Sequence, residues 1–471
     1  MLELDGLPYV MKCVPEYIDL QGTLRAKINE WYMYYLATGD FYEHNEAKRV
    51  GDAQLVEEWK RGSLHPAQMV CSEMSGLIFN EGTRFATNGE GAGVDAANEW
   101  LQSWVIETDY QTACNKSAET ACALGTSAQL LAFSDVADSG AIDPSGRVSI
   151  MRYDARNIFP VAFIEDTVTD VAFTSLASYK NGWAVQVSRV TKEDEGWRIR
   201  NRWFTYGGGD IDDIEELNLP EYAPEVYVPG AEPPFAILKP AGTNPYAVNS
   251  CMGVSVFDGA IPSIRLTDAA FQNFLNDIEL GQKMVFLDED MIKGDRDNRT
   301  LPFDIGKRLF VKVFRGIGGG ASHIEEYNPD LRADQNAKVL STALAVLGMR
   351  TGFGAQYWQF DKASHSIITA TGEIMEQQAL VRTITRHENS FTRPIQDMVT
   401  AMLHALGFEG ASVRLQFDDS VIIDSEAKRN ADRQDVAAGL MPAWRYIKEW
   451  RGVDDDEAKQ WVAETMALAA L

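Results

Sequence analysis

The sequence predicts an α+β protein, because stretches with helical spacing and stretches with strand-like alternation occupy different parts of one chain. Apolar side chains recur every three or four positions over residues 254–280, 329–349 and 367–406, as they do in amphipathic helices. Between residues 130 and 204, apolar and polar side chains alternate, which is typical of half-exposed antiparallel strands. We therefore expect helices and antiparallel sheets in separate regions of the fold.

The chain has 471 residues, which is enough for about three domains and a sizeable core. Its first residues, Met1-Leu2-Glu3-Leu4-Asp5, lack the basic and apolar segments of a secretion signal. The longest nearly apolar run, residues 339–349, is far shorter than the roughly 20 residues that a membrane span requires. These features predict a soluble protein that is not secreted.

The formal net charge is −26, which argues against a protein that grips DNA by neutralising phosphates with Lys and Arg. The cysteines are odd in number and include no Cys-x-x-Cys pair, so neither a disulfide framework nor a zinc site is expected. A reducing cytoplasm fits this pattern best. The cysteines are Cys13, Cys71, Cys114, Cys122 and Cys251.

The N-terminal part is predicted to be mainly helical up to Gly125. An aromatic cluster at residues 31–35 lies within the first long helix, where such side chains usually belong to the core. Residues 63–81 show the spacing of a second packed helix. Residues 96–124 continue the helical pattern until Gly125 interrupts it, and we expect the two cysteines of this stretch to be buried.

Strands are predicted in the following part, at residues 148–151, 158–161, 183–187, 197–204 and 235–238. An acidic, proline-containing stretch at residues 210–234 separates the last two. Its composition predicts a mobile surface excursion from the sheet.

A helix is expected at residues 254–280, with a possible early kink at Pro262. Short strands at residues 283–287 and 307–314 enclose a polar loop at residues 288–300. This alternation predicts a small separate unit between two long helices.

The second long helix is predicted to begin with Asn328 as its cap and Pro329 at its first position. Its apolar stripe ends near Gly348 and Gly352. A loop with four aromatic residues, residues 351–366, follows.

The third long helix is expected to start at about residue 369 and to reach Leu406. Pro394 lies inside it, and an interior proline removes one backbone hydrogen bond and clashes with the preceding turn. We therefore predict a kink at residues 390–394. A returning strand is expected near residues 413–417, followed by a helical region from residue 425 that is broken at residues 439–444.

The order of these last elements resembles that of the portal (head-to-tail connector) proteins of tailed bacteriophages. In that family a stem helix, a tunnel loop and a long kinked helix opening at a Thr-Ala-Thr-Glu-like motif follow one another. The corresponding residues here are Thr369-Ala370-Thr371-Gly372-Glu373, in which Gly372 lengthens the capping box by one residue. The segments at residues 155–161 and 417–420 are also similar to portal sequences.

The resemblance implies a portal fold with an α/β wing, a two-helix stem, a small α/β clip, a long kinked helix and a C-terminal helical crown. The implied division is wing 1–253, first stem helix 254–280, clip 281–328, second stem helix 329–349, tunnel loop 350–366, long helix and returning strand 367–424, and crown 425–471.

The resemblance also implies a function at one vertex of the viral capsid, within the virion, after assembly in the host cytoplasm. A homo-dodecameric ring would form the channel through which double-stranded DNA is packaged and ejected without sequence specificity. The implied protein partners are the large terminase subunit, a head-completion adaptor, and the major capsid and scaffolding proteins. The resemblance implies no enzymatic activity, cofactor, metal or membrane.

Two groups of candidate site residues follow from this assignment. The tunnel loop contains one Lys or Arg, so we expect it to line the channel by shape, although its aromatics fit packing against the long helix better than contact with DNA. Residues 281–320, within the clip, have eight basic and six acidic residues and are expected to face acidic partner surfaces or DNA, with a solvated surface as the alternative. The loop candidates are Gln356, Tyr357, Trp358, Gln359 and Lys362, and the clip candidates are Lys293, Arg296, Arg299, Lys307 and Arg308.

Motifs for enzymatic chemistry are incomplete. The glycine-rich residues 316–321 follow a strand but precede no helix, and the chain has no phosphate-binding Gly-x-x-x-x-Gly-Lys-Ser/Thr loop. Residues 295–306 begin like a calcium loop but have Thr300 where glycine is needed and Gly306 where an acid is needed. The acidic residues 454–457 are read as the start of a helix.

Two alternatives stay open at this point. One is another ring-forming head or tail structural protein of a phage, and the other is an enzyme whose site is too dispersed to be recognised in the sequence.

Overall fold

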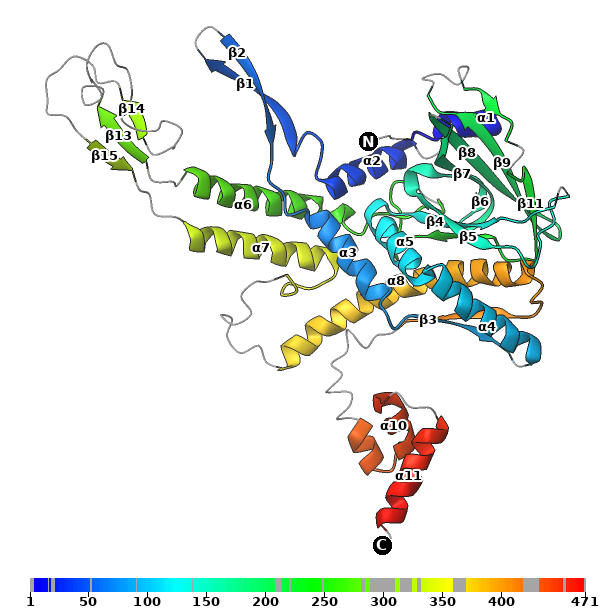
Figure 1. Cartoon of the computed structure of the whole chain (residues 1–471). Helices are drawn as coiled ribbons and strands as arrows, with labels where there is room; N and C mark the ends of the chain where they lie inside the picture. The colour runs from blue at the N-terminus through cyan, green and yellow to red at the C-terminus, as the bar shows by residue number, and fades with distance from the viewer. Residues whose placement is uncertain are drawn as a thin grey trace.

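The computed structural model contains 47% helix and 25% strand, and its sheets are mainly antiparallel, so the predicted α+β class is confirmed (Figure 1). The structure describes residues 4–15, 17, 22–50, 53–89, 91–137, 139–180, 182–207, 214–219, 222–247, 250–280, 284–288, 310–313, 324–327, 332–358, 370–417, 432–451 and 455–469.

The largest sheet has six antiparallel strands in the order β10-β9-β8-β7-β6, with β11 also paired to β9. Helix α1 (Leu7–Cys13) packs on one face, where Tyr9 and Val10 join Val185 and Phe204 in a buried cluster. The other face contributes to the main core. The strands are β6 (Ile158–Ile164), β7 (Thr167–Tyr179), β8 (Gly182–Glu193), β9 (Gly196–Thr205), β10 (Glu216–Leu217) and β11 (Glu225–Pro229).

The acidic stretch at residues 210–234 is not simply a surface excursion, and this prediction was wrong. Its described residues include β10 and β11, both paired with β9. Val226 and Val228 alternate with Tyr227 and are buried, so β11 has the period-two pattern of a half-buried strand. The prolines and acids around it conceal this short pattern in the sequence.

Two smaller sheets complete the central body. One has the order β12-β4-β5 and the other pairs β16 with β3, both antiparallel. The second sheet joins residues that are more than 300 positions apart in the chain, since Leu415 pairs with Phe85. The strands are β3 (Arg84–Asn88), β4 (Ser127–Phe133), β5 (Val148–Asp154), β12 (Phe235–Leu238) and β16 (Ser412–Gln416).

Four helices of the N-terminal half surround these sheets (Figure 1). They are α2 (Gly22–Leu36), α3 (Pro66–Ile78), α4 (Ala92–Glu107) and α5 (Tyr110–Leu124). Trp31 of α2 is fully buried, and its Nε1 donates a hydrogen bond to Asp258 over 2.8 Å, as expected for a core aromatic. Gly125 ends α5 in the left-handed conformation, with φ +78°, where glycine has no Cβ penalty.

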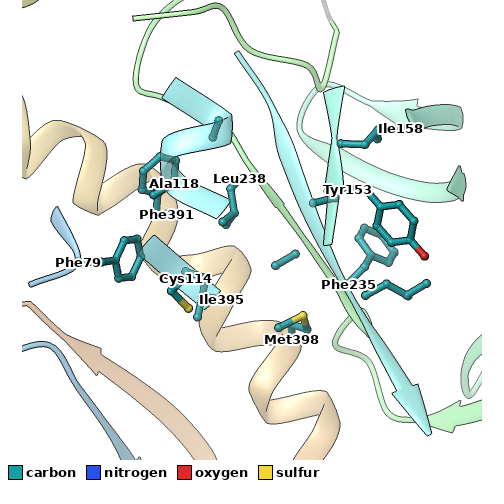
Figure 2. Close-up of a cluster of buried hydrophobic side chains, with 14 of the residues drawn as sticks. Phe79, Cys114, Ala118, Tyr153, Ile158, Phe235, Leu238, Phe391, Ile395 and Met398 are labelled. Carbon is teal, nitrogen blue, oxygen red and sulfur yellow. The ribbon is translucent and has the colours of Figure 1, made fainter. Parts of the chain in front are cut away.

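The core lies where α5, the β12-β4-β5 sheet and the second half of α8 (Ala370–Ala405) meet. Figure 2 shows side chains from these elements converging, including Cys114, Leu238, Phe391 and Met398. Burial raises the pKa of Cys114 to about 12, so this thiol behaves as a small apolar group. The expected burial of Cys114 and Cys122 is confirmed.

Helices α6 (Ile261–Leu280) and α7 (Ala333–Thr351) run side by side away from this body (Figure 1). Beyond them lies a small sheet of β13 (Met284–Asp288), β14 (Phe310–Val313) and β15 (Ile324–Tyr327). Pro262 does not lie in the helix interior, because it is the second residue of α6, where no intrahelical donor is needed. The predicted cap at Asn328 and Pro329 lies outside the described residues.

Helix α8 is continuous over 36 residues and includes Pro394. In Figure 1 its second half lies beneath the central body, while its first half runs away from the body at an angle. Near the C-terminus, α10 (Ala443–Arg451) and α11 (Asp455–Ala469) pack on each other. Helix α11 begins at the acidic run, as expected.

A hairpin of β1 (Glu43–Val50) and β2 (Ala53–Lys60) was not predicted from the sequence. Its residues are mostly polar and show no apolar face, and the Gly51-Asp52 pair between the strands, a possible two-residue turn signal, was missed.

Candidate functional site

Helices α6 and α7 form an antiparallel pair whose inner sides contribute Ile264, Leu344 and Leu347 to the main core. At the far end, Arg332 and Asn336 of the second helix both donate hydrogen bonds to Asp277 of the first, the latter over 2.7 Å. These hydrogen bonds hold the pKa of Asp277 below its usual range. The two helices are thus joined at both ends of the pair.

The outer side of α7 carries an apolar stripe that nothing in the described part of the chain covers. Val339, Val346 and Met349 are 51%, 37% and 67% exposed. Their spacing of seven and three residues places them on one side of the helix, opposite the buried Leu344 and Leu347. Exposed apolar residues in such a row indicate a helix that packs against another protein surface.

The loop after α7 begins with a close backbone contact. Gly352 ends the helix in the left-handed conformation, with φ +87°, and its amide donates to the Gly348 carbonyl, as do the amides of Phe353 and Gly354. A Cβ at position 348 would overlap the Gly354 carbonyl oxygen. One at position 352 would meet Thr383 of α8. The start of the loop is therefore packed between two helices.

Three aromatic residues continue this packing. Phe353 is 2% exposed, and its ring centroid lies 4.9 Å from that of Tyr357 and 5.2 Å from that of Trp358. The Tyr357 hydroxyl donates a hydrogen bond to the Glu73 carboxylate of α3. Burial and this carboxylate raise the pKa of Tyr357. The indole Nε1 of Trp358 is buried and has no hydrogen-bond partner within the described chain.

The structure places only some of the predicted site residues. Gln356, Tyr357 and Trp358 are half-buried at the base of the loop. Gln359, Lys362 and the clip candidates Lys293, Arg296, Arg299, Lys307 and Arg308 lie outside the described residues. Pro394 lies in α8, and the kink at this position stays a prediction.

Glu73 was missed by sequence reasoning. It is one of many acids in a −26 chain and belongs to no motif, so only the fold associates it with a loop 284 residues further on.

A cavity of about 620 Å³ lies apart from the loop, between the β6–β7 turn and the Pro394 region of α8. Its charges are largely paired, since Lys239 bonds Asp166 and Arg393 lies 3.5 Å from Asp397. Burial raises the pKa of Cys251 in its wall to about 12, which keeps that thiol protonated and unreactive. The cavity therefore has no activated nucleophile at this cysteine.

The described residues contain no group of three or more His, Cys, Asp or Glu side chains arranged to hold a metal ion. Among the described helices, none combines the length and apolarity needed to cross a bilayer.

These features are typical of a structural protein: a projecting helix pair with exposed apolar side chains and, among the described residues, no group arranged to hold a metal ion. The family described as "Phage portal protein, SPP1 Gp6-like" matches residues 17–468, and the chain belongs to this family. No curated protein matches the chain. The protein is thus a structural, non-enzymatic virion component at the capsid vertex, and forms an oligomeric ring through which DNA is packaged and ejected. The resemblance seen in the sequence is confirmed, and both alternatives are set aside.

Proposed function

We propose that the subunit is divided as the portal resemblance implies. The central body with its sheets is the wing, α6 and α7 are the stem, and the small β13–β15 sheet belongs to the clip. Residues 350–366 are the tunnel loop, α8 and β16 return to the wing, and α10 and α11 are in the crown. The continuity of α6, the small sheet and α7 along the chain supports this division.

The ring contains twelve subunits, and the α7 stripe is its central contact. A cyclic ring needs two different surfaces that fit one another, one on each side of the subunit. The stripe of Val339, Val346 and Met349 is one such surface. The outer side of α6, where Leu266 is 48% exposed, is its counterpart on the neighbouring subunit. This stripe is the single observation on which the proposed assembly depends.

The tunnel loop lines the narrowest part of the channel and acts by shape rather than by charge. Each Lys or Arg held against a phosphate would add salt-dependent affinity, and a twelve-fold ring multiplies every such contact. Residues 351–366 contain Lys362 as their one cation, next to Asp361. The packing of residues 348–358 supports a fixed base, with the DNA-facing part of the loop beyond Trp358.

The clip docks the large terminase subunit and the head-completion adaptor. Its basic residues give residues 281–320 a charge of +2, from eight basic and six acidic residues, in a chain of −26. Replacing Arg296 and Arg299 by Glu is expected to weaken docking while rings still form. The major capsid and scaffolding proteins contact other parts of the ring, and DNA passes without sequence specificity.

Assembly is tested by the mass of the purified protein in solution together with negative-stain images. We expect a homo-oligomer of twelve subunits with an axial hole. A monomer at every concentration would refute the proposed assembly. A closed ring of another size would change only the proposed number of subunits.

The loop is tested by deleting residues 359–362, which leaves the packed base intact. Rings are expected to assemble, and capsids are expected to contain less DNA or to lose it. Capsids that package and retain a complete genome would show that the loop has another role.

A further inference from the structure

The β1–β2 hairpin stands apart from the sheets of its own subunit. Its strands pair in an unbroken antiparallel register from Glu43 with Lys60 to Val50 with Ala53. No third strand among the described residues pairs with either edge. In Figure 1 the hairpin projects from the junction of α2, α3 and α6, away from the wing. Both of its edges therefore present backbone hydrogen-bonding groups outward.

The base of the hairpin is fixed to α6 by a buried carboxylate. Asp268 is 0% exposed and accepts hydrogen bonds from the Tyr42 hydroxyl at 2.8 Å, the Ser63 hydroxyl at 2.9 Å and the Leu64 amide at 2.9 Å. These donors come from both chain segments that enter the hairpin. One turn further along the helix, Gln272 accepts from the Gly62 amide at 2.5 Å.

Cation–aromatic contacts strengthen the same attachment. The guanidinium of Arg61 lies 4.3 Å from the ring centroid of Phe41 and 5.0 Å from that of Trp59. The guanidinium of Arg265, on α6, lies 4.7 Å from the Phe41 ring. One aromatic ring is thus shared by a cation of the hairpin base and a cation of the stem helix, which fixes the direction of the hairpin relative to α6.

A two-stranded hairpin that no third strand joins is marginally stable in water. A buried carboxylate is also costly unless its hydrogen bonds are fully satisfied. Here the chain uses such a carboxylate to attach the base of the hairpin to α6. We propose that the β1–β2 hairpin is an intersubunit strap that docks on the next copy of this chain in the ring.

The neighbouring copy is the occupant that the observations favour. The family forms a ring, so identical subunits lie beside each other at fixed spacing. The hairpin is anchored to α6, and it points away from the sheets of its own subunit. The inference depends on the family's ring and not on the proposed contact through the α7 stripe, so the two can fail separately.

The first experiment uses rings assembled from equal amounts of unlabelled and fully ¹⁵N-labelled chains, cross-linked with an amine-reactive reagent and analysed by peptide mass spectrometry. Lys48 and Lys60 are the hairpin lysines. We expect cross-links from them that join labelled to unlabelled peptides, because such mixed pairs arise only between subunits. Hairpin cross-links confined to peptides of one isotope would overturn the proposal.

The second experiment removes the hairpin. The Arg61 amide donates to the Tyr42 carbonyl over 2.7 Å, so a two-residue Asn-Gly turn can replace residues 43–60 without moving the base. We expect the shortened chain to keep the parent's circular dichroism spectrum and to lose the ring at denaturant concentrations where parent rings persist. If rings of the shortened chain dissociate at the same denaturant concentration as parent rings, the proposal is overturned.

The third experiment loosens the attachment without removing the hairpin. Asp268→Ala leaves three donors without their acceptor and is expected to reduce the mixed-isotope cross-links from Lys48 and Lys60. Asp277→Ala, near the C-terminal end of the same helix and away from the hairpin base, is the matched control and is expected to leave them unchanged. Equal cross-linking in both variants would contradict a role for Asp268 in positioning the strap.

Discussion

Gly348 of α7 and Gly354 of the loop that follows are packed backbone against backbone, which leaves no room for a Cβ at residue 348. The contact folds the first loop residues back onto the helix that precedes them. Together with the ring contacts of Phe353, it makes residues 348–358 a fixed base rather than the start of a free loop.

Gly348→Ala is expected to destabilise the subunit by about 1–3 kcal/mol, because the added methyl group overlaps a backbone carbonyl and forces the loop to shift. The midpoint of urea unfolding measures this. Gly76→Ala is the matched control, since Gly76 also lies within a helix but has no atom near its Cβ position. It is expected to stabilise by up to about 1 kcal/mol through helix propensity. Equal effects of the two substitutions would show that the Gly348 contact is not tight.

Tyr357→Phe removes the hydroxyl that donates to Glu73 but keeps the ring. We expect a loss of about 1–2 kcal/mol in unfolding free energy, because the hydrogen bond to a carboxylate is lost. Tyr222→Phe, at a tyrosine that is 51% exposed, is expected to change stability very little. If both variants unfold at the parent's midpoint, the Glu73 bond does not hold the loop base.

His387 gives the unfolding free energy a defined pH dependence. Burial lowers its pKa to about 4 from 6.5, and its Nδ1 accepts a hydrogen bond from the Ala241 amide at 2.9 Å. Between these pH values the unfolded chain binds more protons than the folded one, so stability falls as the pH falls. His387 is expected to account for about 1.5 kcal/mol of the loss between pH 6.5 and pH 5.

The test compares the parent with His387→Gln in urea titrations at these two pH values. The variant is expected to be less stable at pH 6.5 but to lose less stability on acidification, because glutamine does not titrate. Parallel losses in the two proteins would mean that His387 is not the group responsible.

Val346→Glu is expected to prevent ring assembly while the subunit stays folded, because it places a charge in the apolar stripe of α7. Native mass spectrometry reports the assembly, and circular dichroism reports the fold. Ile164→Glu is the control, since Ile164 is 80% exposed at the end of β6, far from α7. Intact rings from Val346→Glu would remove the stripe from the subunit interface.

The sequence by itself determined the class of the fold and the order of its long helices. The stripe from Leu340 to Leu347 predicted α7, and Gly352 predicted its end, because local periodicity and capping depend on neighbouring residues. The order of helix, aromatic loop and long helix also sufficed for the family. These features are short-range in the chain, so a single sequence shows them.

Only the tertiary structure decided what those elements contact. The acidic, proline-containing composition of residues 210–234 predicted a surface excursion, but β11 in this stretch pairs with β9. The β1–β2 hairpin is mostly polar and shows no apolar pattern in the sequence. Glu73 reaches Tyr357 and Asp268 reaches Tyr42 across more than 200 residues, and each is one carboxylate among 69 acidic residues. Whether a carboxylate is solvated or buried against a distant hydroxyl depends on which surfaces the whole chain brings together. The packing of the whole chain therefore determines whether a carboxylate is buried, and no local pattern in the sequence predicts it.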